Sequence, residues 1–103
     1  MRAIHLARLD KTRPVLLLTR DIAVGRLRTV TVAAITSTVR GLATEIPVGP
    51  GNGLDRPSAV NLDNVFTIEY VVLGRRVGFL LDDQERLLVS ALAHAFDLDI
   101  AIA

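Results

Sequence analysis

Polar side chains that can bind phosphate groups gather near the ends of the predicted strands. They are Thr12, Arg13, Thr36, Ser37, Thr38, Arg40, Thr44, Glu45, Asp63 and Asn64. A guanidinium group offers a fixed fork of donors to two phosphate oxygens, and hydroxyl or backbone N–H groups add neutral donors around the same anion. These residue types at strand ends therefore indicate a phosphate-binding surface.

A simpler explanation exists for the same residues. The hydroxyl groups of residues 36–38 could do no more than cap a turn, and Arg13 could form a surface ion pair with Asp10 or Asp21. On residue types alone this explanation is favoured, because turn caps and surface ion pairs occur in proteins of every function.

Other kinds of catalysis receive little support. The chain has no cysteine, which excludes disulfides, thiolate metal sites and cysteine nucleophiles. His5 and His94 are far apart in the chain, so neither a metal site nor a cofactor is expected. We expect His5 on a strand with one ring nitrogen satisfied, and His94 on the solvent face of a helix. Nucleophile-elbow, P-loop and dinucleotide motifs are absent, although composition alone leaves serine hydrolysis open.

Length and composition predict one domain over residues 1–103. Half of the residues are hydrophobic, yet charged residues interrupt every apolar run before the roughly 18 residues that a membrane span needs. His5 and Arg8 break the first apolar stretch, so we expect no secretory signal and a cytoplasmic protein.

The formal charge of +1 says little about nucleic-acid binding, which depends on where cations cluster. Arginines concentrate in the first half of the chain and at residues 75–76, whereas five acidic residues fall within 82–99. A basic face opposite an acidic end is one interpretation. Dispersed, solvated charges are an equally good one.

The predicted elements that position these residues are mostly short strands rich in Val, Ile, Leu and Thr, at 2–9, 14–19, 29–35, 44–48, 58–62, 66–68 and 76–80. The glycine-rich residues 49–53 predict a hairpin, and residues 21–25 a connector with one helical turn. Gly74 and Gly78 are expected at bends or bulges.

From residue 82 to residue 96 the apolar residues follow helical spacing instead. They are Leu87, Leu88, Ala91, Leu92, Ala95 and Phe96, and Asp82 or Asp83 is expected to cap the helix. The apolar residues 100–103 should pack back on the body or meet a partner. The fold class is therefore mainly β with a C-terminal helix, as a strongly bent antiparallel sheet that closes toward a small barrel.

Four segments, in this order, resemble motifs of the MazF/PemK toxin family. Residues 12–16 (TRPVL) are similar to the family's Arg-Pro-Val-Leu entry into the second strand, and residues 32–37 (VAAITS) to the motif that closes the third. Residues 55–64 (DRPSAVNLDN) resemble the run with the Asp-Ser-Val pattern, and residues 74–78 (GRRVG) fit the segment before the helix. The resemblance extends from about residue 9 to the end of the predicted helix.

This resemblance implies an SH3-like small barrel that forms a two-fold homodimer with an RNA groove at its interface. Family members are toxins of type II toxin–antitoxin systems that cut single-stranded RNA without a metal ion, leave a 2′,3′-cyclic phosphate and a 5′-hydroxyl, and so inhibit translation and growth. A cognate MazE-like antitoxin lays an extended tail over the dimer and inhibits it.

By motif position, Arg13 and Thr36 take the family's catalytic roles. The expected RNA-binding residues are Ser37, Thr38, Arg40, Glu45, Asp63 and Asn64. Donors such as Arg13 and Thr36 would stabilise the extra negative charge on phosphorus when the 2′-hydroxyl attacks. Glu45 and Asp63 are candidate general bases by residue type, but either could instead read RNA bases, so the base is not assigned.

The chain departs from the family pattern before Arg13, where residues 10–12 replace a longer loop. A shorter lid leaves the groove more open, which makes structured RNA such as tRNA or rRNA a further candidate target beside mRNA. With few aromatic residues available, base recognition should depend on polar groups, and Phe66 is expected in the core.

Two alternative functions belong to other classes. A CcdB-like toxin shares this barrel but poisons DNA gyrase through a protein interface, and the Arg13 and Thr36 motifs argue against it. A plain SH3-like binding module would have no activity at all. Only a nuclease of the MazF kind would cut RNA in the presence of EDTA.

Overall fold

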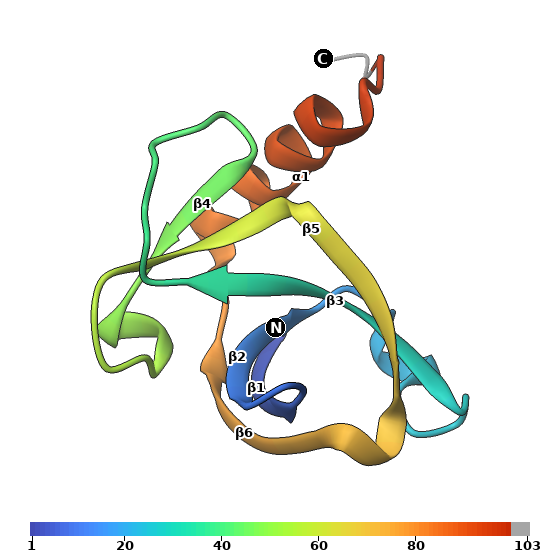
Figure 1. Cartoon of the computed structure of the whole chain (residues 1–103). Helices are drawn as coiled ribbons and strands as arrows, with labels where there is room; N and C mark the ends of the chain where they lie inside the picture. The colour runs from blue at the N-terminus through green and yellow to red at the C-terminus, as the bar shows by residue number, and fades with distance from the viewer. Residues whose placement is uncertain (100–103) are drawn as a thin grey trace.

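The computed structural model describes residues 1–99 as a six-stranded antiparallel sheet followed by one helix (Figure 1). The strands are β1 (Ala3–Arg8), β2 (Thr12–Leu17), β3 (Thr29–Thr36), β4 (Glu45–Val48), β5 (Ser58–Glu69) and β6 (Leu73–Phe79). Helix α1 (Asp82–Phe96) follows, and the short 3-10 turns are η1 (Asp21–Ala23), η2 (Pro50–Asn52) and η3 (Tyr70–Val72). The predicted class, mainly β with a C-terminal helix, is confirmed.

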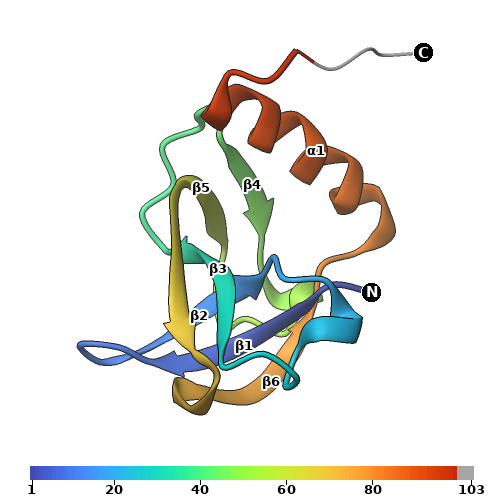
Figure 2. The same ribbon diagram turned by 90° about the vertical axis from the view of Figure 1, so that its right-hand side faces the viewer.

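The sheet has the strand order β4-β5-β3-β2-β1-β6 and is strongly bent, as the curved path of β5 shows in Figure 2. On β3 the partner of Ala33 is Val65, whereas the partner of the next residue, Ala34, is Asn61. Residues 62–64 of β5 therefore form a bulge, which increases the local twist and bend of the strand. This bulge carries Asp63 and Asn64, two of the predicted site residues.

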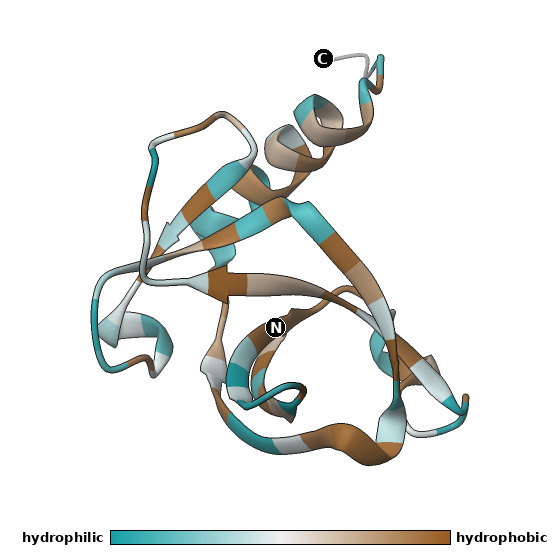
Figure 3. Cartoon of the chain, viewed as in Figure 1, coloured by the Kyte–Doolittle hydropathy of each residue, from teal (hydrophilic) through white to brown (hydrophobic). Residues whose placement is uncertain are grey.

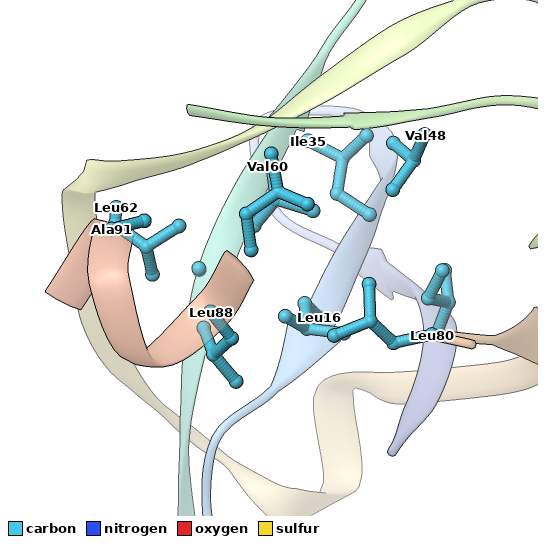
Figure 4. Close-up of a cluster of buried hydrophobic side chains, with 11 residues drawn as sticks. Leu16, Ile35, Val48, Val60, Leu62, Leu80, Leu88 and Ala91 are labelled. Carbon is cyan, nitrogen blue, oxygen red and sulfur yellow. The ribbon is translucent and has the colours of Figure 1, made fainter. Parts of the chain in front are cut away.

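Two hydrophobic clusters fill the bent sheet. The larger one lies between the sheet and α1, where Leu88 and Ala91 of the helix pack near Leu62 and Val60 of β5 (Figure 4). The smaller one lies within the curve of the strands and includes Val15, Val30 and Val32. Along β5 in Figure 3, apolar and polar segments follow one another without strict alternation, and the first half of the strand is mostly buried whereas the second half is partly or fully exposed.

A junction of polar contacts joins η2, β6 and the start of α1, and we call it the η2–α1 junction. The side chain of Asn52 accepts a hydrogen bond from the backbone N–H of Gly49 at 3.1 Å, and donates to the carbonyl oxygen of Phe79 at 2.9 Å and to Oε1 of Gln84 at 2.6 Å. The same Oε1 of Gln84 accepts from the backbone N–H of Leu81. These contacts fix the helix against the hairpin.

The structure confirms several of the sequence predictions for individual elements. Helix α1 has the predicted bounds, β4 and β5 pair as a hairpin, and Gly74 and Gly78 lie at register shifts between β1 and β6. His5 has one satisfied nitrogen, because its Nδ1 lies 2.8 Å from the carbonyl oxygen of Gly74, and His94 is exposed. Phe66 packs against the smaller cluster but is only partly buried.

Other predictions were wrong in detail. The segments 58–62 and 66–68 are one strand, and β2 covers 12–17 rather than 14–19. Leu81, not Asp82 or Asp83, is the N-cap residue, because Gln84 binds its backbone N–H. Leu87 and Phe96 are about half exposed rather than packed on the sheet, at 48% and 56%. The predicted packing of 100–103 lies outside the described residues.

Candidate active site

All eight predicted site residues line one cleft of about 1100 Å³. Its lining comes from the β1–β2 loop, the end of β3 and the loop after it, the segment between η2 and β5, the bulge of β5, and part of β6. Figure 1 shows the positions of these elements. Within the cleft stand the two predicted catalytic residues and the predicted RNA-binding set, Ser37, Thr38, Arg40, Glu45, Asp63 and Asn64. The bent sheet therefore brings together residues that are up to about 50 positions apart in the chain.

Arg13 is the second residue of β2 and is held by the acidic residue of the adjoining loop. Its Nε lies 3.1 Å from Oδ1 of Asp10 and its Nη2 lies 3.2 Å from Oδ2. The hydrogen bond from Arg13 is the main reason that the pKa of Asp10 is lowered from 3.8 to about 2, and the same contact raises the pKa of Arg13. The Asp10 ion pair is thus present, yet it leaves both N–H groups of Nη1 and the second N–H group of Nη2 for a phosphate in the cleft.

Thr36 ends β3 and is half buried. Its Oγ1 accepts a hydrogen bond from the backbone N–H of Thr38 at 3.0 Å. The turn cap that the simpler explanation required is therefore also present. Because a hydroxyl that accepts one bond keeps its own proton, Thr36 can still donate to a phosphate oxygen.

The two acidic residues proposed as possible bases are both engaged in structural contacts. Oε1 of Glu45 accepts hydrogen bonds from the backbone N–H groups of Arg40, Gly41 and Leu42. Oδ2 of Asp63 accepts from the hydroxyl group of Thr44 at 2.6 Å. In each carboxylate the other oxygen is the one that could meet an RNA base or a proton.

The structure adds residues to the cleft that the sequence analysis did not select. They are the cations Lys11, Arg56 and Arg75 and the acidic residues Asp10 and Asp55. Arg56 and Arg75 lie inside two segments that carry the family resemblance, so their place in those segments was the available signal. With Arg13 and Arg40, five cations line the cleft beside four carboxylates, those of Asp10, Glu45, Asp55 and Asp63. An RNA backbone would therefore meet cations at separate points and not a uniformly basic surface.

Residues 5–96 match the model of the family described as PemK-like, MazF-like toxin of type II toxin-antitoxin system. The chain belongs to this family. The prediction of an endoribonuclease toxin of the MazF kind is therefore confirmed.

Individual relatives agree with the family assignment. This MazF-family chain is 56% identical to the endoribonuclease MazF3 of Mycobacterium tuberculosis over the full length of both chains. It superposes on the solved structure of the Mycobacterium tuberculosis toxin MazF-mt6 with a TM-score of 0.93, at 56% identity, covering 96% of this chain and 100% of that one. A mycobacterial endoribonuclease in complex with its cognate antitoxin has the same fold at 24% identity, with a TM-score of 0.84 and coverage of 96% and 95%.

Two further observations concern metals and membranes. Within residues 1–99, no group of three or more His, Cys, Asp or Glu side chains is placed to hold a metal ion. No helix in the described part of the chain is long and apolar enough to cross a membrane.

Proposed function

We propose that this toxin cleaves single-stranded RNA in the cleft, with no metal ion or cofactor, and leaves a 2′,3′-cyclic phosphate and a 5′-hydroxyl. The observation that carries the proposal is that Arg13 and Thr36, from different strands, line one cleft together with the six predicted RNA-binding residues. Because β2 and β3 are paired neighbours in the sheet, donors from both strands can contact a single phosphate group.

In the proposed reaction the 2′-hydroxyl gives its proton to solvent as its oxygen attacks the adjacent phosphorus. The bond from phosphorus to the 5′-oxygen breaks, and that oxygen takes up one proton from solvent, so that no net proton is released. Arg13 and Thr36 stabilise the extra negative charge on the phosphate oxygens in the transition state. A guanidinium group rarely gives up its proton, so Arg13 acts by charge and hydrogen bonding rather than by full proton transfer. DNA lacks the attacking hydroxyl and should not be cut.

The open cleft bears on the choice of substrate. Only three residues, 9–11, connect β1 to β2, so no long lid covers the entry beside Arg13. We include tRNA and rRNA loops with mRNA among the substrates, because single-stranded loops can enter such a cleft without being unwound first. Cleavage of these RNAs in the cytoplasm would inhibit translation and growth.

We also propose that the toxin acts as a symmetric homodimer. Several large apolar side chains are exposed on the single chain, including Val39, Leu42, Val89, Phe96 and Leu98. A second copy that covers such side chains would remove their apolar surface from water, and two-fold dimers are the commonest oligomers. Light scattering at micromolar concentration should give twice the mass of one chain.

A cognate MazE-like antitoxin is the proposed inhibitor. The family is defined by toxin–antitoxin systems, and a mycobacterial member of the same fold has been solved with its antitoxin. Arginines that receive phosphates also receive carboxylates, so an acidic, extended segment should occupy the cleft and compete with RNA. Both ligands bound at saturation to the same dimer would contradict this.

The direct test is cleavage of a fluorogenic RNA by the purified protein in the presence of EDTA, followed by analysis of the product ends. We expect cyclic phosphate ends and no cleavage of the matched DNA. Intact RNA under these conditions would contradict the proposed cleavage without a metal ion. Mapping the 5′ ends of cellular RNA after induction would then identify the cleavage sequence.

A further inference from the structure

The loop between β3 and β4, residues 37–44, carries three of the eight predicted site residues. Ser37, Thr38 and Arg40 are exposed on it and line the cleft. A loop without regular hydrogen bonding holds side chains in place only where other contacts fix its backbone.

One carboxylate fixes the middle of this loop. Oε1 of Glu45 lies 3.1 Å from the backbone nitrogen of Arg40, 2.8 Å from that of Gly41 and 3.2 Å from that of Leu42. Gly41 has a φ of +72°, the left-handed conformation that turns successive N–H groups toward one point. Such a backbone concavity is a nest for an anion, and here the anion is the protein's own side chain.

The backbone that carries this carboxylate belongs to the sheet. Glu45 is the first residue of β4, is half buried, and pairs with Asn61 of β5. Beside it, Thr44 donates to Asp63 at 2.6 Å, and the backbone N–H of Leu62 donates to the carbonyl oxygen of Thr44 at 2.9 Å. The nest is thus tied to the sheet at the same place where β5 bulges into the cleft.

We propose that Glu45 is a positioning residue that acts on RNA binding by holding residues 40–42, and with them Thr38 and Arg40, in place at the rim of the cleft. The inference rests on the proposed function of the cleft in RNA binding. Because Glu45 fills the nest, the three N–H groups are not offered to an RNA phosphate, which meets the side chains of the loop instead. Hydrogen bonds to a charged acceptor are stronger than neutral ones, which suits a carboxylate to this task.

The first test needs no RNA. Amide hydrogen exchange is measured by NMR for Glu45→Ala and Glu45→Gln, with Glu69→Ala and Glu69→Gln as matched controls, because Glu69 is exposed at the end of β5 and outside the cleft. Exchange at Arg40, Gly41 and Leu42 should rise about tenfold or more in Glu45→Ala and less in Glu45→Gln, which keeps one acceptor oxygen. Unchanged exchange at these three amides would overturn the proposal.

The second test separates positioning from chemistry. With a short RNA substrate, Glu45→Ala should raise KM about fivefold and change kcat by less than about twofold, because the loop contributes binding rather than charge stabilisation. Combining Glu45→Ala with Arg40→Gln should cost less than the sum of the two single effects, because both act through the same contact with RNA.

The remaining outcomes are also decisive. A fall in kcat of about 10²-fold or more at unchanged KM would make Glu45 a participant in the chemistry and overturn the positioning role. Faster exchange without any change in KM would show that the loop does not bind RNA. If the wild-type protein cuts no RNA, the proposed function fails, and the exchange experiment still decides whether Glu45 holds the loop.

Discussion

The η2–α1 junction and the cleft are built from the same kinds of polar side chain but use them in opposite ways. At the junction, Asn52 is 3% exposed and both ends of its amide group are engaged within the protein. In the cleft, Asn64 is exposed. Arg13 and Thr36 each make one contact within the protein and keep further hydrogen-bond donors for a ligand.

This difference separates structural from functional polar groups. A buried amide must have its hydrogen bonds satisfied, and at the junction the protein satisfies them itself. A site that binds RNA must instead keep donors for its ligand and hold them on a firm support. Substitutions at the junction should therefore change the stability of the protein, whereas substitutions in the cleft should change RNA cleavage.

The largest effect should come from the tightest point of the junction. A Cβ on Gly78 would overlap the backbone carbonyl oxygen of Asn52, so Gly78→Ala should cost on the order of 4 kcal/mol or more in the free energy of unfolding. Gly51→Ala is the control, since a Cβ there meets nothing within 4 Å. Urea unfolding curves of the two variants test this, and similar curves would show that β6 can move away from η2.

The next largest effect belongs to the cleft. Arg13→Ala should lower single-turnover cleavage by at least about 10²-fold, the scale for losing one preorganised donor, and leave the melting temperature nearly unchanged. Arg13→Lys should not restore activity, because an ammonium group cannot make a two-pronged contact. Near-normal cleavage by Arg13→Ala would leave the residue with only its surface pair to Asp10 and overturn the site assignment.

Thr36 provides a parallel test on β3, the strand that pairs with β2. Thr36→Ala should lower cleavage by about 10²-fold, whereas Thr36→Ser should stay active, because the hydroxyl group is what a phosphate needs. Thr36→Ala also removes the hydrogen bond from the backbone N–H of Thr38, which could disturb the loop after β3. Amide exchange of this loop is therefore measured in the alanine variant, to separate a change in loop structure from a loss of chemistry. Equal activity of both variants would remove Thr36 from the mechanism.

Sequence patterns predicted most elements and selected eight candidate residues that the fold brings to one cleft, because strands, a helix and family motifs each leave a local signal. They did not predict that β5 continues through Asp63 and Asn64, because two adjacent polar residues in a strand pattern indicate the end of a strand. The bulge at these residues arises from the pairing of β5 with β3, which local patterns do not show. A family motif selected Asn64, but no local pattern indicated that Asn52, an asparagine in a glycine-rich turn, is buried and bonded to Phe79 and Gln84. Only the tertiary fold decides which amide is enclosed.

That pair of asparagines gives a direct comparison of the two regions. Asn52→Ala leaves the N–H of Gly49 and the carbonyl oxygen of Phe79 without their partner and should cost about 2 kcal/mol of unfolding free energy. Cleavage per folded molecule should stay within about twofold. Asn64→Ala should change stability by less than about 0.5 kcal/mol and weaken RNA binding instead. The opposite pattern would reverse the roles assigned to the two regions.

The smallest effects should come from the two ion pairs, one beside each region. Arg2 binds Glu85 of α1 at 2.7 Å and also donates to the carbonyl oxygens of Leu17 and Leu18, and its hydrogen bond lowers the pKa of Glu85. The side chains of Asp10 and Arg13 are more exposed, and their ion pair joins residues that are only three positions apart in the chain. Exposed pairs contribute little and are screened by salt, so Asp10→Asn should matter less than Glu85→Gln.

Acid titration of unfolding, with each variant compared with the wild type, tests this last expectation. Both carboxyl pKa values are lowered in the folded state, so each contribution is fully present above the ordinary pKa of the unfolded chain and disappears as the pH falls through the folded value. For Asp10 that window runs from about pH 4 down to about pH 2. The difference between wild type and Asp10→Asn should therefore vanish across this window, and also in about 1 M salt at neutral pH, where screening is strongest. A difference for Asp10→Asn larger than that for Glu85→Gln would show that the rim of the cleft is a structural region like the junction.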